Sequence, residues 1–279
     1  MPVKQRQTWQ GDDRTEENLS ADGGPLLKPC LLEGINFQFD PYFGCGHQCV
    51  YCYALCRSGG EWNRRVYRYE NMVDRLRQEL MTLDPQRIYM GWNTDPYQPA
   101  ERKEKATHQS LHVLAKAGFT VTLLTKSDLI LRDLQILKSM HEVSAGISLA
   151  FPNESVRNDF EPAAPSNTRR IEALRKLRSS GISTYALICP VIPLLTDITS
   201  LIRDLSDSAA TIWVYPLSVN RRSDRNWKNI CGILKTNYLE SENQIHDIAL
   251  DPDHEYWSEQ REMLIGLAKK TGLEIHVEF

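Results

Sequence analysis

The sequence lacks any apolar run long enough to cross a lipid bilayer, and residues 1–20 are mostly polar or charged. A membrane-spanning helix needs about 20 consecutive apolar residues. A secretory signal peptide needs an apolar core close to the N-terminus. Neither pattern is present, so we expect a cytoplasmic protein that makes no attachment to a membrane.

The sequence also has no excess of positive charge, no internal repeat and no low-complexity tract. Its formal net charge of −3 creates no overall field that would attract nucleic acid or a membrane surface, although a local basic patch is compatible with it. The 279 residues are 41% hydrophobic and 25% charged, which is ordinary for a soluble globular protein with a substantial core.

Cysteine is uncommon, yet four of the seven cysteines fall between positions 45 and 56. In a reducing compartment such a cluster is more often a metal site than a set of disulfides. Cys45, Cys49 and Cys52 follow the spacing C-x3-C-x2-C. An iron–sulfur cube takes four ligands, so three thiolates leave one iron open to an outside ligand. The loop therefore predicts a [4Fe–4S] site with an open position.

The alternative is a structural zinc site that stabilises a binding module. His47 or Cys56 would then complete the ligand set. Structural zinc sites usually combine two short ligand pairs from separate parts of the chain, and no second C-x-x-C pair exists in this sequence. We therefore prefer the iron–sulfur interpretation.

Strand and helix patterns alternate from residue 35 onward. Periodicity predicts strands at about 35–39, 87–92, 119–125, 143–150, 183–189 and 211–216, and helices at about 70–83, 104–117, 128–141, 167–180 and 197–206. Such alternation is typical of a parallel sheet, and six units are too few for a closed eight-stranded barrel. We expect an α/β fold, an open, partial (β/α)6 TIM-like barrel, with the cysteine loop after the first strand. Site residues should follow the carboxyl ends of the strands.

This interpretation divides the chain into three parts. Residues 1–30 are polar and are expected to form a flexible N-terminal arm. Residues 31–217 form the partial barrel. Residues 218–279 form a C-terminal extension packed on the barrel, with helices near 226–238 and 254–271 and an edge strand near the end.

The segment from Tyr42 to Ala54, Y-F-G-C-G-H-Q-C-V-Y-C-Y-A, resembles the cluster loop of radical SAM enzymes. The resemblance is strongest to the spore photoproduct lyase-like branch, the DNA repair photolyase-like radical SAM proteins. Later motifs resemble the same branch over about residues 35–217, namely Asn93–Glu101, Thr125–Ser127, Gly146–Ser148, Glu161–Ser166 and Pro190–Pro193. The resemblance implies two cofactors, a [4Fe–4S] cluster and S-adenosyl-L-methionine.

The resemblance also implies a mechanism. In this superfamily the open iron binds the amino and carboxylate groups of S-adenosylmethionine. One electron from the reduced cluster then produces a 5′-deoxyadenosyl radical, which takes a hydrogen atom from the substrate. This chemistry needs a one-electron donor such as flavodoxin or ferredoxin. The cofactors carry the difficult chemistry, and the protein positions them and excludes water.

Carried over residue by residue, the resemblance makes Cys45, Cys49 and Cys52 the cluster ligands. It also implies a set of contacts to S-adenosylmethionine, which are Tyr51, Thr94, Asp95, Lys126, Ser148, Arg169 and Ile192. It assigns no catalytic side chain.

Several of these contacts have a specific expected role. Tyr51 would lie beside the adenine, and Lys126 would meet the methionine carboxylate. Thr94 and Asp95 would contact the amino group or the ribose. Each side chain also has a simpler interpretation as a packing, turn-forming or ion-pairing residue. For Arg169 the neighbouring Arg170 is an equal candidate, and either could instead pair with Glu161.

One position departs from the resembling branch. Spore photoproduct lyase returns a hydrogen atom through a cysteine at the end of the second strand, and Trp92 or Asn93 occupies that place here. We therefore do not expect the lyase reaction itself. Two substrate classes stay open, a nucleobase or nucleotide and a peptide or small metabolite. Peptide-modifying relatives often add a cysteine-rich extension, whereas residues 218–279 contain a single cysteine, Cys231, which favours a base or a small molecule over a peptide.

Overall fold

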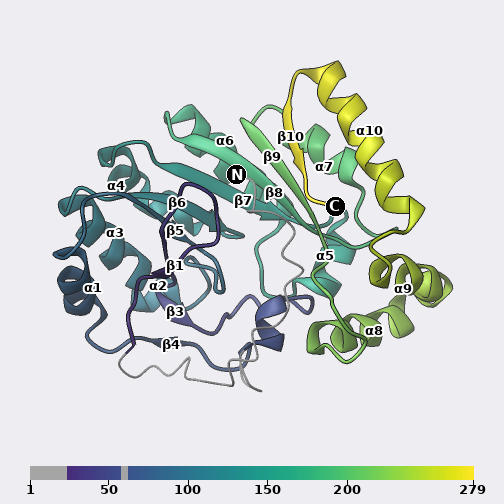
Figure 1. The fold of residues 1–279 in the computed structure, drawn as a ribbon, viewed down its shortest axis with the longest axis horizontal. Helices are drawn as coiled ribbons and strands as arrows, with labels where there is room; N and C mark the ends of the chain where they lie inside the picture. Colours follow the sequence, from purple (N-terminus) through teal and green to yellow (C-terminus); the bar gives the residue numbers. More distant parts are fainter. Residues whose placement is uncertain (1–23, 58–61) are drawn as a thin grey trace.

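The computed structural model describes residues 24–57 and 62–279 of the chain. In these residues an eight-stranded sheet has the order β1-β2-β5-β6-β7-β8-β9-β10, and helices lie along its outer side (Figure 1). The strands are β1 Lys28–Pro29, β2 Phe37–Phe39, β5 Arg87–Met90, β6 Thr120–Thr125, β7 Ser144–Leu149, β8 Ser183–Val191, β9 Thr211–Pro216 and β10 Glu274–Val277. All neighbours from β2 to β10 are parallel. The expected α/β fold with a partial, mostly parallel barrel is confirmed.

The helices connect successive strands as the alternation predicted. Those of the barrel are α1 Met72–Leu80, α2 Glu101–Glu104, α3 Ala106–Lys116, α4 Leu134–Ser139, α5 Glu154–Phe160, α6 Asn167–Ser179 and α7 Ile198–Leu205. Those of the C-terminal part are α8 Arg225–Asn237, α9 Glu242–Leu250 and α10 Glu255–Thr271. Short 3₁₀ helices are η1 Tyr53–Cys56, η2 Asp128–Asp133 and η3 Leu239–Ser241.

Two predicted helices are interrupted. The helix expected at 104–117 is divided into α2 and α3 because Lys105 adopts a left-handed conformation with φ of 53°. The helix expected at 128–141 begins as the 3₁₀ helix η2, and only its second half is α-helical. Helix α6, by contrast, begins where the Ser166 cap predicted, because the Ser166 side chain accepts a hydrogen bond from Arg169 N.

The structure also contains short elements that the sequence patterns did not predict. The strands β3 Tyr42–Phe43 and β4 Tyr67–Arg68 form an antiparallel pair beside the cysteine loop. Helix α5 begins at an Asn153 cap, whose side chain accepts hydrogen bonds from two backbone N–H groups. Helices α5 and α9 span seven and nine residues, and such short segments give a weak periodic signal.

The prediction of a flexible N-terminal arm over residues 1–30 is wrong for residues 26–30. Residues 1–23 lie outside the described part of the chain. Leu26 and Leu27, however, are buried, and their N–H groups donate to the Glu79 carboxylate at 2.8 and 2.9 Å. Strand β1 then pairs with β2. Apolar burial and sheet pairing therefore make residues 26–30 part of the barrel.

The C-terminal part joins the barrel through its last strand and through α8. Strand β10 continues the sheet beyond β9 in parallel register, so the predicted edge strand is present. Near the start of α8, Asn226 donates through Nδ2 to Tyr51 O at 3.2 Å and to Ser218 O at 2.9 Å. Residues 175 positions apart are thereby joined at the cysteine loop. No helix among residues 24–57 and 62–279 combines the length and apolar character needed to span a bilayer.

Apolar side chains gather in three places. The main core fills the space between the sheet and the outer helices. A second core connects the cysteine loop to α5 and α8 through Tyr51, Phe160 and Trp227. A third, small cluster of Ala54, Leu55 and Trp62 lies against the cysteines. The cysteine loop is thus surrounded by packed structure on several sides.

Candidate functional site

The cysteine loop is held by backbone contacts that require glycine. Gly44 has φ of +83°, and a Cβ there would lie 2.1 Å from Arg65 O. Gly44 O accepts hydrogen bonds from Thr94 Oγ1 at 2.6 Å and from Gln98 Nε2 at 2.9 Å. Gly46 N donates to Gln98 Oε1 at 2.7 Å. A fully buried glutamine therefore fixes both sides of the first cysteine.

The three cysteines of this loop have the donor chemistry of an iron–sulfur site. Burial raises the pKa of Cys45 to about 12 and also raises the pKa values of Cys49 and Cys52. Buried thiols of this kind are held as thiolates only by a strong positive charge, such as that of bound metal. Apolar side chains of the third cluster cover two of them, Cys45 and Cys52. The donor set therefore fits a buried metal cluster.

The arrangement differs from that of a mononuclear site. Among the described residues, no three His, Cys, Asp or Glu side chains are arranged to hold one metal ion. In a cubane the thiolates bind different irons, so they lie farther apart than the ligands of a single ion. The zinc arrangement considered above, with His47 or Cys56 as the fourth ligand, is not formed in the described residues.

A buried cluster of charged and polar side chains lies beside the loop, at the carboxyl edge of the sheet. At its centre is Glu161, which is fully buried. Arg170 Nη2 lies 2.5 Å from Glu161 Oε2, and Lys126 Nζ lies 3.7 Å from Glu161 Oε1. The Tyr51 hydroxyl donates to the same carboxylate. Lys126 Nζ also donates to Ser148 Oγ at 2.7 Å. Three of the expected contacts, Tyr51, Lys126 and Ser148, are therefore brought together.

The charges of this cluster do not cancel. Burial alone would raise the pKa of Glu161, but Arg170 and Lys126 hold it down to about 2. Burial opposes the charge of Lys126, yet the Glu161 and Cys49 charges raise its pKa. One carboxylate thus faces two cations, and the buried cluster carries one positive charge in excess. A region of this kind favours an anionic ligand group.

Asp95 connects the cysteine loop to the neighbouring strand. Its carboxylate accepts hydrogen bonds from Thr125 Oγ1, Lys126 N and Tyr97 N at 2.6, 2.6 and 2.8 Å, and lies 3.2 Å from His47 Nε2. Burial would raise its pKa, but the charge of His47 and these hydrogen bonds lower it to about 2. Asp95 is therefore ionised and fully engaged by protein groups. Thr94 also donates a hydrogen bond to the loop, at Gly44 O. The Thr94 and Asp95 side chains therefore both hold the cysteine loop in place.

The structure places the two candidate arginines, Arg169 and Arg170, in different surroundings. Arg169, the expected cofactor contact, is half exposed and pairs with Asp128 at 2.7 Å on the outer surface. Arg170 is fully buried and points to the site, where it also donates to Pro165 O and Ser148 O at 2.8 and 3.1 Å. The reason is the helical register, because residues 169 and 170 lie about 100° apart around α6.

The remaining expected contact, Ile192, lies in the second core. Its side chain is fully buried in the same apolar cluster as Tyr51, and its N–H donates to Thr196 Oγ1 at 2.9 Å. Sequence reasoning missed Gln98, His47 and Asn226, whose partners lie about 50 to 175 residues away in the sequence. One sequence pattern could have indicated these buried polar residues, namely a polar residue between apolar or rigid neighbours. Gln98, between Tyr97 and Pro99, is an example.

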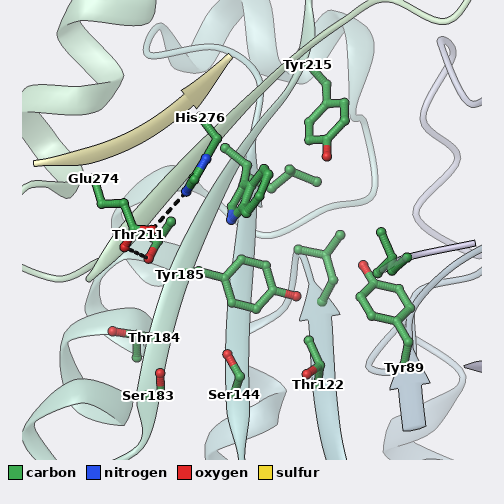
Figure 2. A pocket seen from close by; sticks show the side chains of 14 residues that line it. Tyr89, Thr122, Ser144, Ser183, Thr184, Tyr185, Thr211, Tyr215, Glu274 and His276 are labelled. Carbon is green, nitrogen blue, oxygen red and sulfur yellow. Dashed lines mark hydrogen bonds and ion pairs between the residues drawn. The ribbon is translucent and has the colours of Figure 1, made fainter. Parts of the chain in front are cut away.

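A cavity of about 400 Å³ lies inside the curved sheet below this cluster. Figure 2 shows the rings of Tyr89, Tyr185 and Tyr215 turned toward the same space. Trp213 and His276 stack with ring centres 3.9 Å apart. The other lining residues are Leu32, Thr122, Leu124, Ser144, Ser183, Thr184, Leu187, Thr211 and Glu274. The cavity thus combines aromatic faces with hydroxyl groups.

The alternation of side chains along the strands joins this cavity to the charged cluster. Successive residues of a strand point to opposite faces, so every second residue shares a face. On β6, Thr122 and Leu124 line the cavity, and Lys126 follows on the same face. On β8, Leu187 lines it and Cys189 follows. The cavity therefore shares the inner face of the sheet with the charged cluster and extends from it toward the amino ends of the strands, where Ser144, Ser183 and Thr211 line it.

Comparison with known proteins assigns the family. Residues 40–204 match the radical SAM superfamily. An uncharacterized protein of Methanocaldococcus jannaschii is 32% identical over 219 residues, which are 77% of this chain and 81% of that protein. The chain belongs to the radical SAM superfamily. It is accordingly an enzyme whose cofactors are a [4Fe–4S] cluster and S-adenosylmethionine.

Solved structures show the same fold at low sequence identity. A spore photoproduct lyase variant with bound AdoMet and dinucleoside spore photoproduct has a TM-score of 0.61 and 15% identity, covering 91% of this chain and 78% of the lyase. Streptococcus suis SuiB bound to S-adenosylmethionine has a TM-score of 0.55 and 13% identity, covering 88% of this chain and 50% of SuiB. These similarities confirm the expected likeness to spore photoproduct lyase at the level of the fold.

Proposed function

We propose that this chain cleaves S-adenosylmethionine reductively and abstracts a hydrogen atom from a nucleobase-containing substrate. The observation that carries the proposal is the position of three half-buried cysteines beside a buried cluster with excess positive charge, at the carboxyl edge of a partial barrel. When bound, the [4Fe–4S] cluster and S-adenosylmethionine supply the 5′-deoxyadenosyl radical. Cys45, Cys49 and Cys52 would hold the cluster.

The side chains around the cysteines divide the remaining work. Lys126 and Arg170 offer positive charge to the methionine carboxylate, while Glu161 keeps both of them aligned. Ser148 orients the Lys126 ammonium group through their hydrogen bond. Tyr51 and Ile192 form an apolar wall suited to the adenine. These assignments agree with the contacts of the charged cluster and of the second core.

Thr94 and Asp95 act in this proposal by positioning other groups. Thr94 fixes the carbonyl of Gly44, and Asp95 links His47 of the loop to the backbone of Lys126. Their hydrogen-bonding atoms are occupied by protein partners. The expectation that they contact the methionine amino group or the ribose is therefore replaced by a role in holding the loop and β6 in register.

The aromatic cavity supports the substrate class. The aromatic rings that line the cavity offer faces suited to a planar base, and base–aromatic stacking contributes about 1–3 kcal/mol per base. Spore photoproduct lyase, which shares the fold, has been solved with a dinucleoside photoproduct. The lyase reaction itself is not proposed, because Trp92 or Asn93 occupies the place of the hydrogen-donating cysteine.

We also propose a cytoplasmic location and a one-electron donor of the flavodoxin or ferredoxin type. All seven cysteines are free, which suits a reducing compartment. The [4Fe–4S] cluster has no reductant of its own, so the electron that reduces it must come from a partner protein.

The test is anaerobic reconstitution with iron and sulfide, followed by dithionite and S-adenosylmethionine. We expect 5′-deoxyadenosine, detected by mass spectrometry, and its loss in a Cys49→Ala variant. Cys231→Ala is the matched control, since this cysteine lies on α8 outside the loop, and it should keep the activity. Product formation by Cys49→Ala at the unaltered rate would refute the assignment.

The substrate class is tested separately. Deuterated nucleosides and dinucleotides are incubated with the reconstituted protein, and deuterium is followed into 5′-deoxyadenosine. Transfer from a labelled base or its methyl group supports the proposal. Transfer only from labelled peptides or small metabolites would show that the cavity accepts a different class.

A further inference from the structure

The three cysteines are half-buried, and a small group of apolar side chains packs against two of them. Trp62 is 3% exposed, and its carbonyl accepts a hydrogen bond from Cys45 N at 3.0 Å. Its ring meets the Phe43 ring edge-on with centres 5.1 Å apart. Trp62 belongs to the small apolar cluster against which Cys45 and Cys52 pack. On this side, the covering of the cysteines is therefore largely aromatic.

The exposed residues close to Trp62 in the sequence are mainly basic. Arg57, Arg64, Arg65 and Arg68 are all exposed, and we call them the arginine patch. Between residues 57 and 68 the sequence contains these four arginines and a single acidic residue, Glu61, in a chain whose net charge is −3. The positive charge is thus a local feature that opposes the overall charge of the molecule.

Local contacts connect two of these arginines to the cysteine loop. The Arg57 guanidinium lies 4.6 Å from the centre of the Tyr53 ring, and Tyr53 directly follows Cys52. The carbonyl of Arg65 lies directly against Gly44. Tyr67, 42% exposed, lies between Arg65 and Arg68 in the sequence. Arginine and tyrosine are the residue types that interfaces favour.

We propose that the arginine patch is the docking surface for the one-electron donor, an acidic redox protein of the flavodoxin or ferredoxin type. This inference rests on the proposed function, because it takes Cys45, Cys49 and Cys52 as the cluster ligands. In the transfer, the carrier loses one electron and the cluster gains it, with no bond made or broken. Electron-transfer encounters are small and transient, and charge complementarity chiefly accelerates and orients them.

A nucleic-acid surface is the other use that a basic patch could have. The position of the patch favours the redox partner, since the segment that carries it includes Trp62, which packs with Phe43 against Cys45 and Cys52. The aromatic cavity proposed for the nucleobase opens inside the sheet and is lined by strands β5 to β10, none of which contributes to the patch. A redox partner benefits from closeness to the cysteines, whereas a nucleic acid would gain nothing from it.

The experiment measures electron transfer from reduced flavodoxin to the reconstituted protein under anaerobic conditions. Stopped-flow absorbance follows flavin oxidation across a series of salt concentrations. The patch variant is Arg64→Glu/Arg65→Glu. The matched control is Arg175→Glu/Arg203→Glu, two exposed arginines on the outer helices α6 and α7. Arg64→Lys/Arg65→Lys retains the charge and tests whether charge itself is required.

We expect the second-order rate constant of the patch variant to fall by about tenfold or more at low salt, with a weaker salt dependence. The control and the lysine variant should keep the original rate to within about twofold. Iron content and dithionite-driven formation of 5′-deoxyadenosine should be unchanged in all variants, which shows that the loop is intact and separates this inference from the proposed function.

An unchanged rate and salt dependence in the patch variant would overturn the inference while dithionite-driven activity stands. Loss of the rate in the patch and control variants alike would also overturn it. If the patch variant loses affinity for a DNA oligonucleotide but still accepts electrons at the original rate, the patch is a nucleic-acid surface. Failure of dithionite-driven activity in the unaltered protein would instead count against the proposed function.

Discussion

Replacing Arg170 by alanine removes one partner of a fully buried ion pair. The Arg170 guanidinium lies 2.5 Å from the Glu161 carboxylate, and both side chains are completely buried. It also donates to the carbonyls of Pro165 and Ser148. The substitution therefore leaves a buried carboxylate with fewer partners and two buried carbonyl oxygens without this donor.

The expected cost follows from burial. Removing one partner of a buried pair typically destabilises a protein by about 3–5 kcal/mol, because the other charge is left uncompensated. Lys126 and Tyr51 still contact Glu161, which places the expected value near the lower end, about 3 kcal/mol. In a chain of this size that lowers the melting temperature by roughly 5 °C.

The neighbouring arginine provides the control. Arg169 pairs with Asp128 at 2.7 Å, but its side chain is 50% exposed. Exposed ion pairs contribute about 0–1 kcal/mol, so Arg169→Ala should be nearly neutral. Urea denaturation followed by circular dichroism, on metal-free protein under reducing conditions, measures both free energies of unfolding.

The same two variants test the assignment of the cofactor contact. Equilibrium binding of S-adenosylmethionine to the reconstituted protein should weaken by at least about tenfold in Arg170→Ala, the effect of losing one charge-assisted hydrogen bond. It should stay unchanged in Arg169→Ala. Equal losses of stability in the two variants, or weaker binding only in Arg169→Ala, would refute the choice of Arg170 over Arg169.

Three other predictions concern the loop, the charged cluster and the cavity. Gly44→Ala places a Cβ against Arg65 O at positive φ, so iron content after reconstitution should fall by more than half. Gly34→Ala carries similar φ strain without a clash and should bind iron normally. Because the pKa of Glu161 is depressed from 4.5 to about 2, its contribution to stability is complete above pH 4.5 and declines as the pH falls toward 2. The urea midpoint of the unaltered protein should therefore drop between pH 4.5 and 2, and that of Glu161→Gln should drop less steeply. Parallel plots of midpoint against pH for the two proteins would contradict this. Trp213→Ala should weaken binding of a nucleoside substrate by about tenfold, whereas Trp213→Phe keeps a stacking face; equal affinities in a binding titration would exclude stacking there.

The local parts of the fold were predictable because periodicity reports them directly. The six parallel strands from β2 to β9 and the helix α6 follow from alternation, apolar spacing and the Ser166 cap. The break between α2 and α3 was not predictable, because Lys105 adopts φ of 53° in a sequence with good helix-forming residues. Tertiary contacts decide such conformations, and local propensity does not encode them.

The choice between Arg169 and Arg170 was within reach of the sequence. Leu174 and Leu177 mark the buried face of α6, and position 170 precedes them by four and seven residues, which places it on the same face. Position 169 falls outside this stripe. Applying the helical register to polar residues, as well as to apolar ones, would have identified the buried arginine.

The supports of the cysteine loop could not be read from local sequence. Gln98 and His47 act through partners about 50 residues away, and no periodic pattern connects residues at such separations. Their burial is what distinguishes them, and it depends on how the strands are arranged. Motif resemblance located the loop, while only the three-dimensional structure identified what holds it.

The hydrogen bond between Asn226 and the Tyr51 carbonyl has a consequence for biosynthesis. Its two ends are 175 residues apart, and ribosomes add about 5–20 residues per second, so roughly 10–35 seconds separate their synthesis. During that interval the nascent loop presents its cysteines without the closing contact from α8. The contact that closes the loop from α8 can therefore form only after translation has passed residue 226.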